Sequence, residues 1–189
     1  MSDTQTRAFC VDEDYDRANA GDGRSRYRSY LDSRSHLFVE DGEPVTDPLV
    51  FAATVFTIAN SPVMSPGYVR QHPRIRAVSW CWDDDHRIGF DIHLPAPLPA
   101  PVATALRGQD WADWQRDWRS DWWWEPYDND RPAAYTVLIV RVPLPVDILP
   151  APVYRDGVPD LATAKTAVAV VCDQLNTHLA GILTALNQR

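Results

Sequence analysis

Three residue types that cooperate in nucleophilic and acid–base catalysis occur close together in the middle of the chain. Ser79, Asp91 and His93 lie in two runs where apolar and polar residues alternate. A hydroxyl, a carboxylate and an imidazole can perform such chemistry when their reactive atoms converge on one point. No nucleophile elbow and no oxyanion donor accompany them, so the polar face of a strand is the main interpretation and a catalytic site the alternative.

The run DDDHR at residues 83–87 places three carboxylates and an imidazole in one tight turn. Hard cations prefer oxygen ligands, but adjacent aspartates do not automatically converge on one ion, and Asp is a frequent turn residue. We therefore interpret the turn as solvated, with Asp83, Asp85 and His86 as an alternative cation site. The motifs GxGxxG, GxxxxGK[ST] and HExxH do not occur, so the sequence predicts no cofactor and no zinc-protease site.

The segment DWADWQRDWRSDWWW, residues 110–124, carries six tryptophans in fifteen positions. At about 100° per residue, a helix would place four of them in one stripe with four aspartates beside it. Each indole side chain offers roughly 200 Å², so the stripe exceeds the apolar patch that a monomer usually leaves uncovered. The sequence therefore predicts a Trp-rich helix within residues 102–124 whose stripe is covered.

Two interpretations of this stripe stay open. It packs on the protein's own sheet, or another protein covers part of it, because Trp is enriched in the residues that dominate binding energies. Trp123 and Trp124 point away from the stripe and are the better candidates for an interface. The candidate binding surface comprises Trp118, Trp122, Trp123, Trp124, Asp117 and Asp121.

The elements that must position the catalytic candidates form a hairpin over residues 76–94. Two alternating apolar sets must share one face, and a slip by one residue would turn one set away. The register that satisfies this pairs Trp82 with Ile88, Trp80 with Phe90 and Val78 with Ile92. It also places Ser79 opposite Asp91, with His93 two residues along on the same face.

Four further elements follow from composition and periodicity. The apolar run at 133–142 predicts a central strand, and 46–60 a buried helix with Asp47 as N-cap. A C-terminal helix begins after Asp160, and its wide apolar stripe predicts packing on the sheet. We expect a short helix over 24–34 and consider a short strand at 35–40.

The chain of 189 residues is long enough for one domain with a substantial core. Residues 1–35 are polar and predict a loosely held, flexible acidic and polar arm, followed by a single α+β domain over 36–189. We expect a small, mainly antiparallel sheet packed by the C-terminal amphipathic helix and the Trp-rich helix.

A net charge of −8 argues against direct binding to nucleic acid or to an anionic membrane surface and favours a basic protein partner. Three cysteines without a pairing motif predict reduced thiols, and the N-terminus shows no leader pattern, so we expect a cytoplasmic location.

The favoured function is a non-enzymatic accessory or binding protein that uses the Trp-rich acidic helix as an interaction surface. One alternative is a small enzyme with a Trp-walled pocket and Asp/His acid–base chemistry. The other is a structural protein that forms a homodimer through its C-terminal helix.

Overall fold

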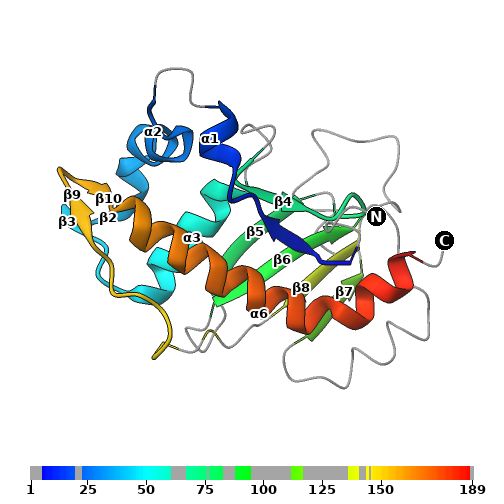
Figure 1. The fold of residues 1–189 in the computed structure, drawn as a ribbon. Coiled ribbons are helices and arrows are strands. Elements are labelled where there is room, and N and C mark those ends of the chain that lie inside the picture. The colour runs from blue at the N-terminus through cyan, green and yellow to red at the C-terminus, as the bar shows by residue number, and fades with distance from the viewer. Residues whose placement is uncertain are drawn as a thin grey trace, which may run out of the picture.

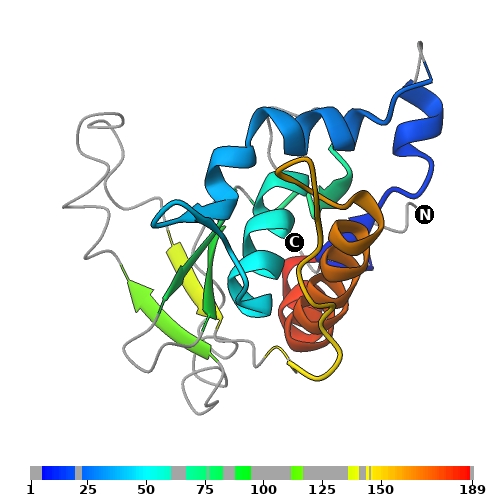
Figure 2. The same cartoon turned by 90° about the vertical axis from the view of Figure 1, so that its left-hand side faces the viewer.

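The structure, a computed structural model, describes residues 6–19, 23–60, 67–75, 77–82, 88–94, 112–116, 136–140, 144 and 146–187. It combines small antiparallel sheets with helices, which confirms the predicted α+β class. The elements are arranged around helix α3 (Pro48–Ala59), with a four-stranded sheet on one side and helix α6 (Leu161–Asn187) on the other (Figures 1 and 2). No helix in these ranges combines the length and apolar character that crossing a bilayer requires.

The main sheet contains β5 (Ala77–Trp82), β6 (Ile88–Leu94), β7 (Ala112–Arg116) and β8 (Thr136–Val140). The strand order is β5-β6-β8-β7, and each pair of neighbours is antiparallel. The interior position of β8 confirms the prediction from its nearly continuous apolar sequence, which suits a strand with neighbours on both sides.

The register of the β5–β6 hairpin is the one derived from the sequence. Phe90 and Ile92 are both buried, and a slip by one residue would turn one strand's set away from the core. All three predicted pairs are present: Trp82 with Ile88, Trp80 with Phe90 and Val78 with Ile92.

The prediction of a helix is wrong for Ala112–Arg116, which forms strand β7 and pairs with β8 along its whole length. The tryptophan spacing fits a helix, but the second edge of β8 also needs hydrogen-bond partners, and tryptophan suits strands. Pairing between strands here overrides the helical period. The rest of the predicted helix, residues 102–111 and 117–124, lies outside the described residues.

Helix α3 (Pro48–Ala59) forms the central layer of the molecule. It confirms the predicted buried helix: the Asp47 side chain accepts a hydrogen bond from Leu49 N at 2.8 Å, and Pro48 occupies the first turn. Almost every side chain from Phe51 to Ala59 is buried. A helix that is apolar all round can be covered only from several sides, which explains its position between the sheet and α6.

Helix α6 (Leu161–Asn187) begins after Asp160, whose carboxylate accepts a hydrogen bond from Thr163 N at 3.2 Å. The helix packs against α3 and strand β1 (Phe9–Val11), and α3 lies between α6 and the main sheet (Figure 2). The sequence predicted that α6 packs directly on the sheet. The spacing of its apolar residues shows that one face of the helix is covered, but it does not identify the covering element. The buried residues of the stripe are Ala164, Val168, Val171, Cys172, Leu175, Leu179 and Leu183.

The N-terminal segment is part of the core, whereas its polarity predicted a loosely held arm. The side chains of Ala8, Phe9, Tyr15, Tyr27 and Leu31 are buried. The average hydropathy of this segment is low, but the segment also contains a few large apolar side chains. Their burial is enough to hold a short segment in place. The segment consists of β1 (Phe9–Val11), α1 (Tyr15–Asn19) and α2 (Arg26–Ser33), of which α2 confirms the short helix expected over 24–34.

Two small hairpins were not predicted as such; the short strand considered at 35–40 is present only at Val39–Glu40, after a 3-10 helix. Each hairpin turns on an Asp-Gly pair with positive φ at both residues: 51° and 84° at Asp41 and Gly42, and 55° and 76° at Asp156 and Gly157. Asp-Gly between two strands is a strong local signal for such a turn, so the sequence did contain the information. The elements are the 3-10 helix η2 (Ser35–Phe38) with β2 (Val39–Glu40) and β3 (Glu43–Pro44), and β9 (Tyr154–Arg155) with β10 (Val158–Pro159).

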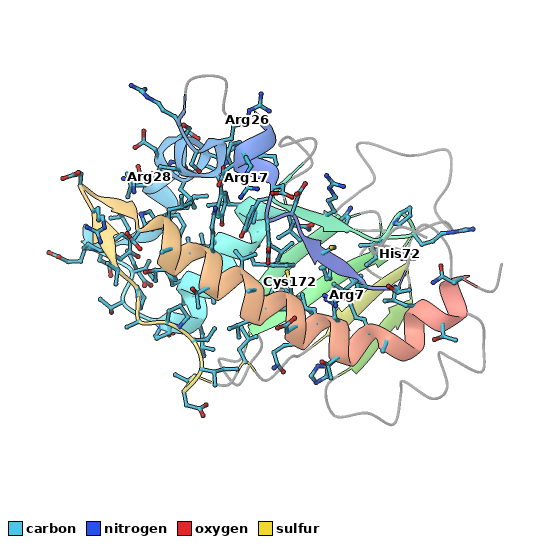
Figure 3. The ribbon with its side chains drawn as sticks, in the orientation of Figure 1. Arg7, Arg17, Arg26, Arg28, His72 and Cys172 are labelled. Carbon is cyan, nitrogen blue, oxygen red and sulfur yellow. The ribbon has the colours of Figure 1, made fainter. Side chains whose placement is uncertain are left out.

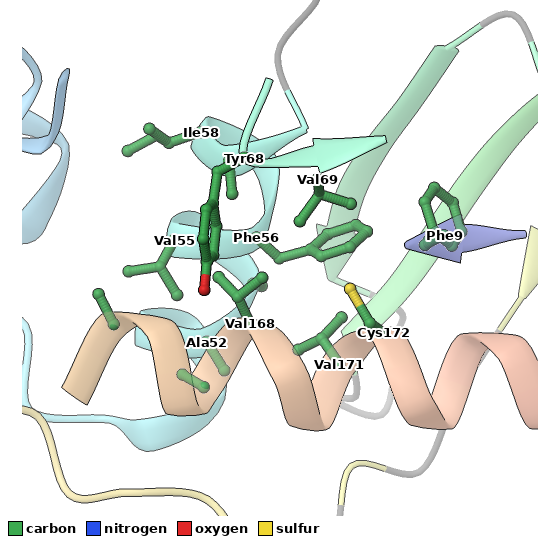
Figure 4. Packing of buried hydrophobic residues seen from close by; sticks show 14 of the residues in the cluster. Phe9, Ala52, Val55, Phe56, Ile58, Tyr68, Val69, Val168, Val171 and Cys172 are labelled. Carbon is green, nitrogen blue, oxygen red and sulfur yellow. The ribbon is translucent and has the colours of Figure 1, made fainter. Parts of the chain in front are cut away.

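Edge-to-face aromatic contacts connect the layers. The ring of Phe56 on α3 lies 5.2 Å from that of Phe9 on β1 and 5.5 Å from that of Phe90 on β6, both measured between centroids. Figure 4 shows Phe56 among side chains of β1, β4 (Val69–Gln71) and α6. The core is therefore shared by segments from both ends of the chain.

Candidate functional site

A cavity of about 580 Å³ opens between β1 and α6. This volume lies in the range of roughly 300–1,000 Å³ that is common for ligand sites. Figure 3 labels Arg7, from the segment before β1, and Cys172, from α6. The lining residues are Arg7, Phe9, Cys10, Val11, Asp12, Glu13, Asp14, Tyr68, Ala169, Cys172, Asp173 and Asn176.

One side chain in the wall of the cavity binds β1 in the way that a neighbouring strand would. Asn176 of α6 accepts a hydrogen bond from Phe9 N at 2.9 Å and donates one to Phe9 O at 2.8 Å. These are the two bonds that a residue of a neighbouring strand would make with Phe9. The carboxamide therefore covers the edge of β1 at Phe9 and fixes this strand to α6.

Beyond Asn176, no described residue pairs with the same edge of β1. Its other edge pairs with β4, where Asp12 N donates to Tyr68 O and His72 N donates to Ala8 O. Because the direction of main-chain groups alternates along a strand, Phe9 and Val11 direct theirs away from β4. Phe9 uses its groups to bind Asn176, whereas Val11 N–H has no hydrogen-bond partner in the described part of the chain.

The wall of the cavity is predominantly acidic, with four carboxylates and one arginine. Asp12 binds Arg70 at 2.6 Å, and Asp14 binds Arg17 at 3.3 Å. Glu13 and Asp173 form no ion pair within the described ranges. Carboxylates on opposite walls of a concave surface reinforce each other's field, so the cavity attracts cations.

The only lysine of the chain, Lys165, lies beside the cavity and binds Asp16 at 2.7 Å. Its ammonium also lies 5.2 Å from the centre of the Tyr68 ring. Burial alone would raise the pKa of Asp16, but hydrogen bonds from Lys165, Ser25 and Tyr27 outweigh it and lower the pKa below its ordinary value. This ion pair fixes α1 to the first turns of α6.

The ionisable groups at the floor of the cavity stay neutral. Burial raises the pKa of Tyr68 to about 12, and its ring stacks on that of Tyr27 with centroids 4.8 Å apart. Burial also raises the pKa of Cys172, which is a thiol and not half of a disulfide. A neutral, buried thiol is a poor nucleophile, so these groups suit binding better than covalent chemistry.

The predicted catalytic residues hold the expected positions in the sheet. Ser79 pairs with Asp91, and His93 pairs with Ala77 at the next pair on the same side of the ladder. Strand β7 adds Asp113 to the row of Asp91, on the far side of β8. The side chains of these residues are not among those described, so their convergence stays a prediction.

The other predicted site residues lie outside the described residues. These are Asp83, Asp85 and His86 of the acidic turn, and Trp118, Trp122, Trp123, Trp124, Asp117 and Asp121 of the Trp-rich segment. Within the residues that the structure does describe, no three His, Cys, Asp or Glu side chains are grouped so that they could hold a metal ion.

Sequence analysis did not find the cavity. Two signals pointed to it: an acidic run that directly follows the apolar FCV at residues 9–11, and a polar residue in the apolar stripe of α6. Asn176 follows Cys172 by four residues and precedes Leu179 by three, the spacing of buried positions. A polar residue at such a position indicates a specific hydrogen bond, although its partner cannot be derived from the spacing.

The helix stripe that suggested a homodimer is used inside the chain. The buried side chains of α6, such as Val168 and Leu175, are covered by the chain's own residues. These described side chains therefore pack within the chain, and a homodimer through α6 stays a prediction. No known protein family, curated protein or solved structure matches this chain.

Proposed function

We propose that the protein is a non-enzymatic binding protein that holds a basic segment of another protein in the cavity between β1 and α6. The observation that carries this proposal is a cavity of about 580 Å³ lined by four carboxylates and one arginine. Two of these carboxylates, Glu13 and Asp173, form no ion pair with a described side chain. A cationic side chain can supply a counter-charge.

The charge of the whole protein supports the same proposal. A net charge of −8 attracts cationic partners over a distance of about one Debye length and repels anionic ones. A cytoplasmic location is part of the proposal, because a reducing compartment suits the thiol of Cys172. The Trp-rich segment around Trp123 and Trp124 remains a predicted second contact surface for the same partner.

The proposal can be tested with fluorescein-labelled penta-arginine and penta-glutamate as probes, titrated with the protein and followed by fluorescence anisotropy. The test variant is Glu13→Gln/Asp173→Asn. The control variant is Glu40→Gln/Glu43→Gln on the exposed β2–β3 hairpin, which removes the same number of charges elsewhere. Any difference between the two variants therefore reports the cavity and not the net charge.

We expect penta-arginine to bind and penta-glutamate not to bind. The cavity variant should bind penta-arginine roughly 3- to 30-fold more weakly than the wild type, because two ion pairs of moderate strength are lost. The hairpin control should change the affinity for penta-arginine by less than about twofold, as expected for exposed charges that do not contact the peptide. Equal weakening by both variants, or no binding of penta-arginine, would contradict the proposal.

A further inference from the structure

The edge of β1 at Val11 presents main-chain hydrogen-bonding groups to the cavity. This feature is independent of the acidic charge of the cavity. The Val11 N–H points to the same side as the Phe9 groups, toward α6, and Val11 lines the cavity. Its carbonyl has one contact, with Cys10 Sγ at 3.7 Å, and a carbonyl oxygen can accept a second hydrogen bond. A donor and an acceptor are therefore presented side by side, as on the edge of a sheet.

Asn176 shows how a ligand can bind to this edge. Its carboxamide satisfies Phe9 with one donor and one acceptor at 2.8 and 2.9 Å, so the edge already binds an amide group. The same carboxamide blocks the continuation of a ligand strand past Phe9. On the other side of Val11, the chain turns at Glu13 and enters α1. The open edge is thus one residue pair long.

We infer that the basic segment binds in extended conformation and pairs with Val11 through two main-chain hydrogen bonds. This inference rests on the proposed function and adds the mode of binding to it. Strand addition of this kind derives affinity from main-chain bonds and specificity from the side chains around the edge. Here Glu13 and Asp173 select basic side chains at positions that flank the paired residue.

Charge decides which occupant fits. A second copy of this protein would bring a net charge of −8 to a cavity that is itself acidic, which opposes association. A segment rich in Arg or Lys reverses the sign of this interaction. The occupant is therefore an extended basic segment of a different protein.

Three peptides test the main-chain pairing directly. The parent probe is labelled Arg-Val-Arg-Val-Arg with both ends blocked. One derivative is N-methylated at both valines, and the other at all three arginines. Successive N–H groups of an extended peptide point to opposite edges, so each derivative blocks one edge and leaves the charge unchanged.

We expect one methylated derivative to bind about tenfold more weakly than the parent and the other to stay within about threefold, because only one peptide edge faces Val11. Equal affinities of both derivatives, whether retained or lost together, would overturn the inference, because a one-sided ladder must distinguish the two edges.

The protein variant Val11→Pro provides a second, independent test. Proline removes the N–H of residue 11 and is tolerated where the N–H of an edge strand points away from the sheet. The matched control, Val11→Ala, shortens the side chain and keeps the N–H. Thermal unfolding of both variants establishes that they are folded before the titration.

Val11→Pro should bind the parent peptide about three- to tenfold more weakly than Val11→Ala does, as expected for one lost hydrogen bond. If Glu13→Gln/Asp173→Asn weakens binding while Val11→Pro and N-methylation do not, the strand pairing is wrong and the proposed function stands. If neither penta-arginine nor the parent peptide binds, the proposed function itself is wrong.

Discussion

A single carboxamide determines the shape of the candidate site at the scale of residues. Asn176 lines the cavity and binds Phe9 through two hydrogen bonds, so that Val11 is the position of the same edge without a partner among the described residues. This contact joins residues 167 positions apart in the sequence. Periodicity detects local patterns, so it could mark Asn176 as an exception in the stripe but could not name Phe9 as its partner.

The ion pair of Asp16 with Lys165 predicts a dependence of stability on pH. The folded-state pKa of Asp16 lies below its ordinary value of 3.8. Its stabilising contribution is therefore complete above that value and is lost as the pH falls through the lower, folded-state pKa. At pH 6 we expect Asp16→Asn to reduce the free energy of unfolding by about 1–2 kcal/mol, because charged hydrogen bonds are lost.

Urea unfolding of the wild type and of Asp16→Asn between pH 6 and pH 2.5 measures this effect. The difference between the two should shrink as the pH falls through the folded-state pKa of Asp16, because protonation removes the charge that the variant lacks. Asp14→Asn is the matched control, because Asp14 and Arg17 form an exposed pair with little expected effect. A difference that is the same at every pH would show that the charge of Asp16 is not its cause.

At the scale of elements, the predictions succeeded where two constraints agreed. The β5–β6 register follows from two apolar sets that must share a face, and α3 follows from a cap, a proline and an apolar run. Strand β7 was missed because helical spacing of tryptophans was the only constraint considered there. Pairing with β8, 20 or more residues later in the chain, decided the conformation instead.

Replacing glycine by alanine should have opposite effects on stability in the turn of the β9–β10 hairpin and in helix α6. Gly157 has a φ of 76°, where a Cβ is unfavourable, although no atom lies within 4 Å of that Cβ position. Gly157→Ala should therefore lower the free energy of unfolding by about 1–2 kcal/mol. Gly181→Ala lies in α6 with equally open surroundings and should raise it by about 0.5–1 kcal/mol.

Chemical denaturation of the two glycine variants checks both signs at once. If both substitutions changed stability in the same direction, the assignment of a left-handed turn at Gly157 or of a regular helix at Gly181 would be wrong.

The whole molecule is held together by contacts through its central helix. Phe56 of α3 is fully buried and contacts Phe9 on one side and Phe90 on the other. We expect Phe56→Ala to cost about 3–5 kcal/mol, because it removes a large core side chain that contacts two layers. Val153→Ala is the control, since Val153 is 42% exposed and its truncation should cost less than about 0.5 kcal/mol.

Urea unfolding followed by both circular dichroism and tryptophan fluorescence tests this prediction. Because the layers share one core, the two signals should change together in the wild type and in the variant. Separate transitions, or a loss below about 1 kcal/mol, would show that the sheet and the helices are stabilised independently.

The hydrogen bonds between Phe9 and Asn176 also have a consequence for synthesis on the ribosome. Strand β1 is translated before its partner on α6, which follows 167 residues later. At about 5–20 residues per second, the delay is roughly 8–30 seconds. During this time the nascent chain presents an uncovered strand edge at Phe9 as well as at Val11, which is the period when a chaperone would protect it from aggregation.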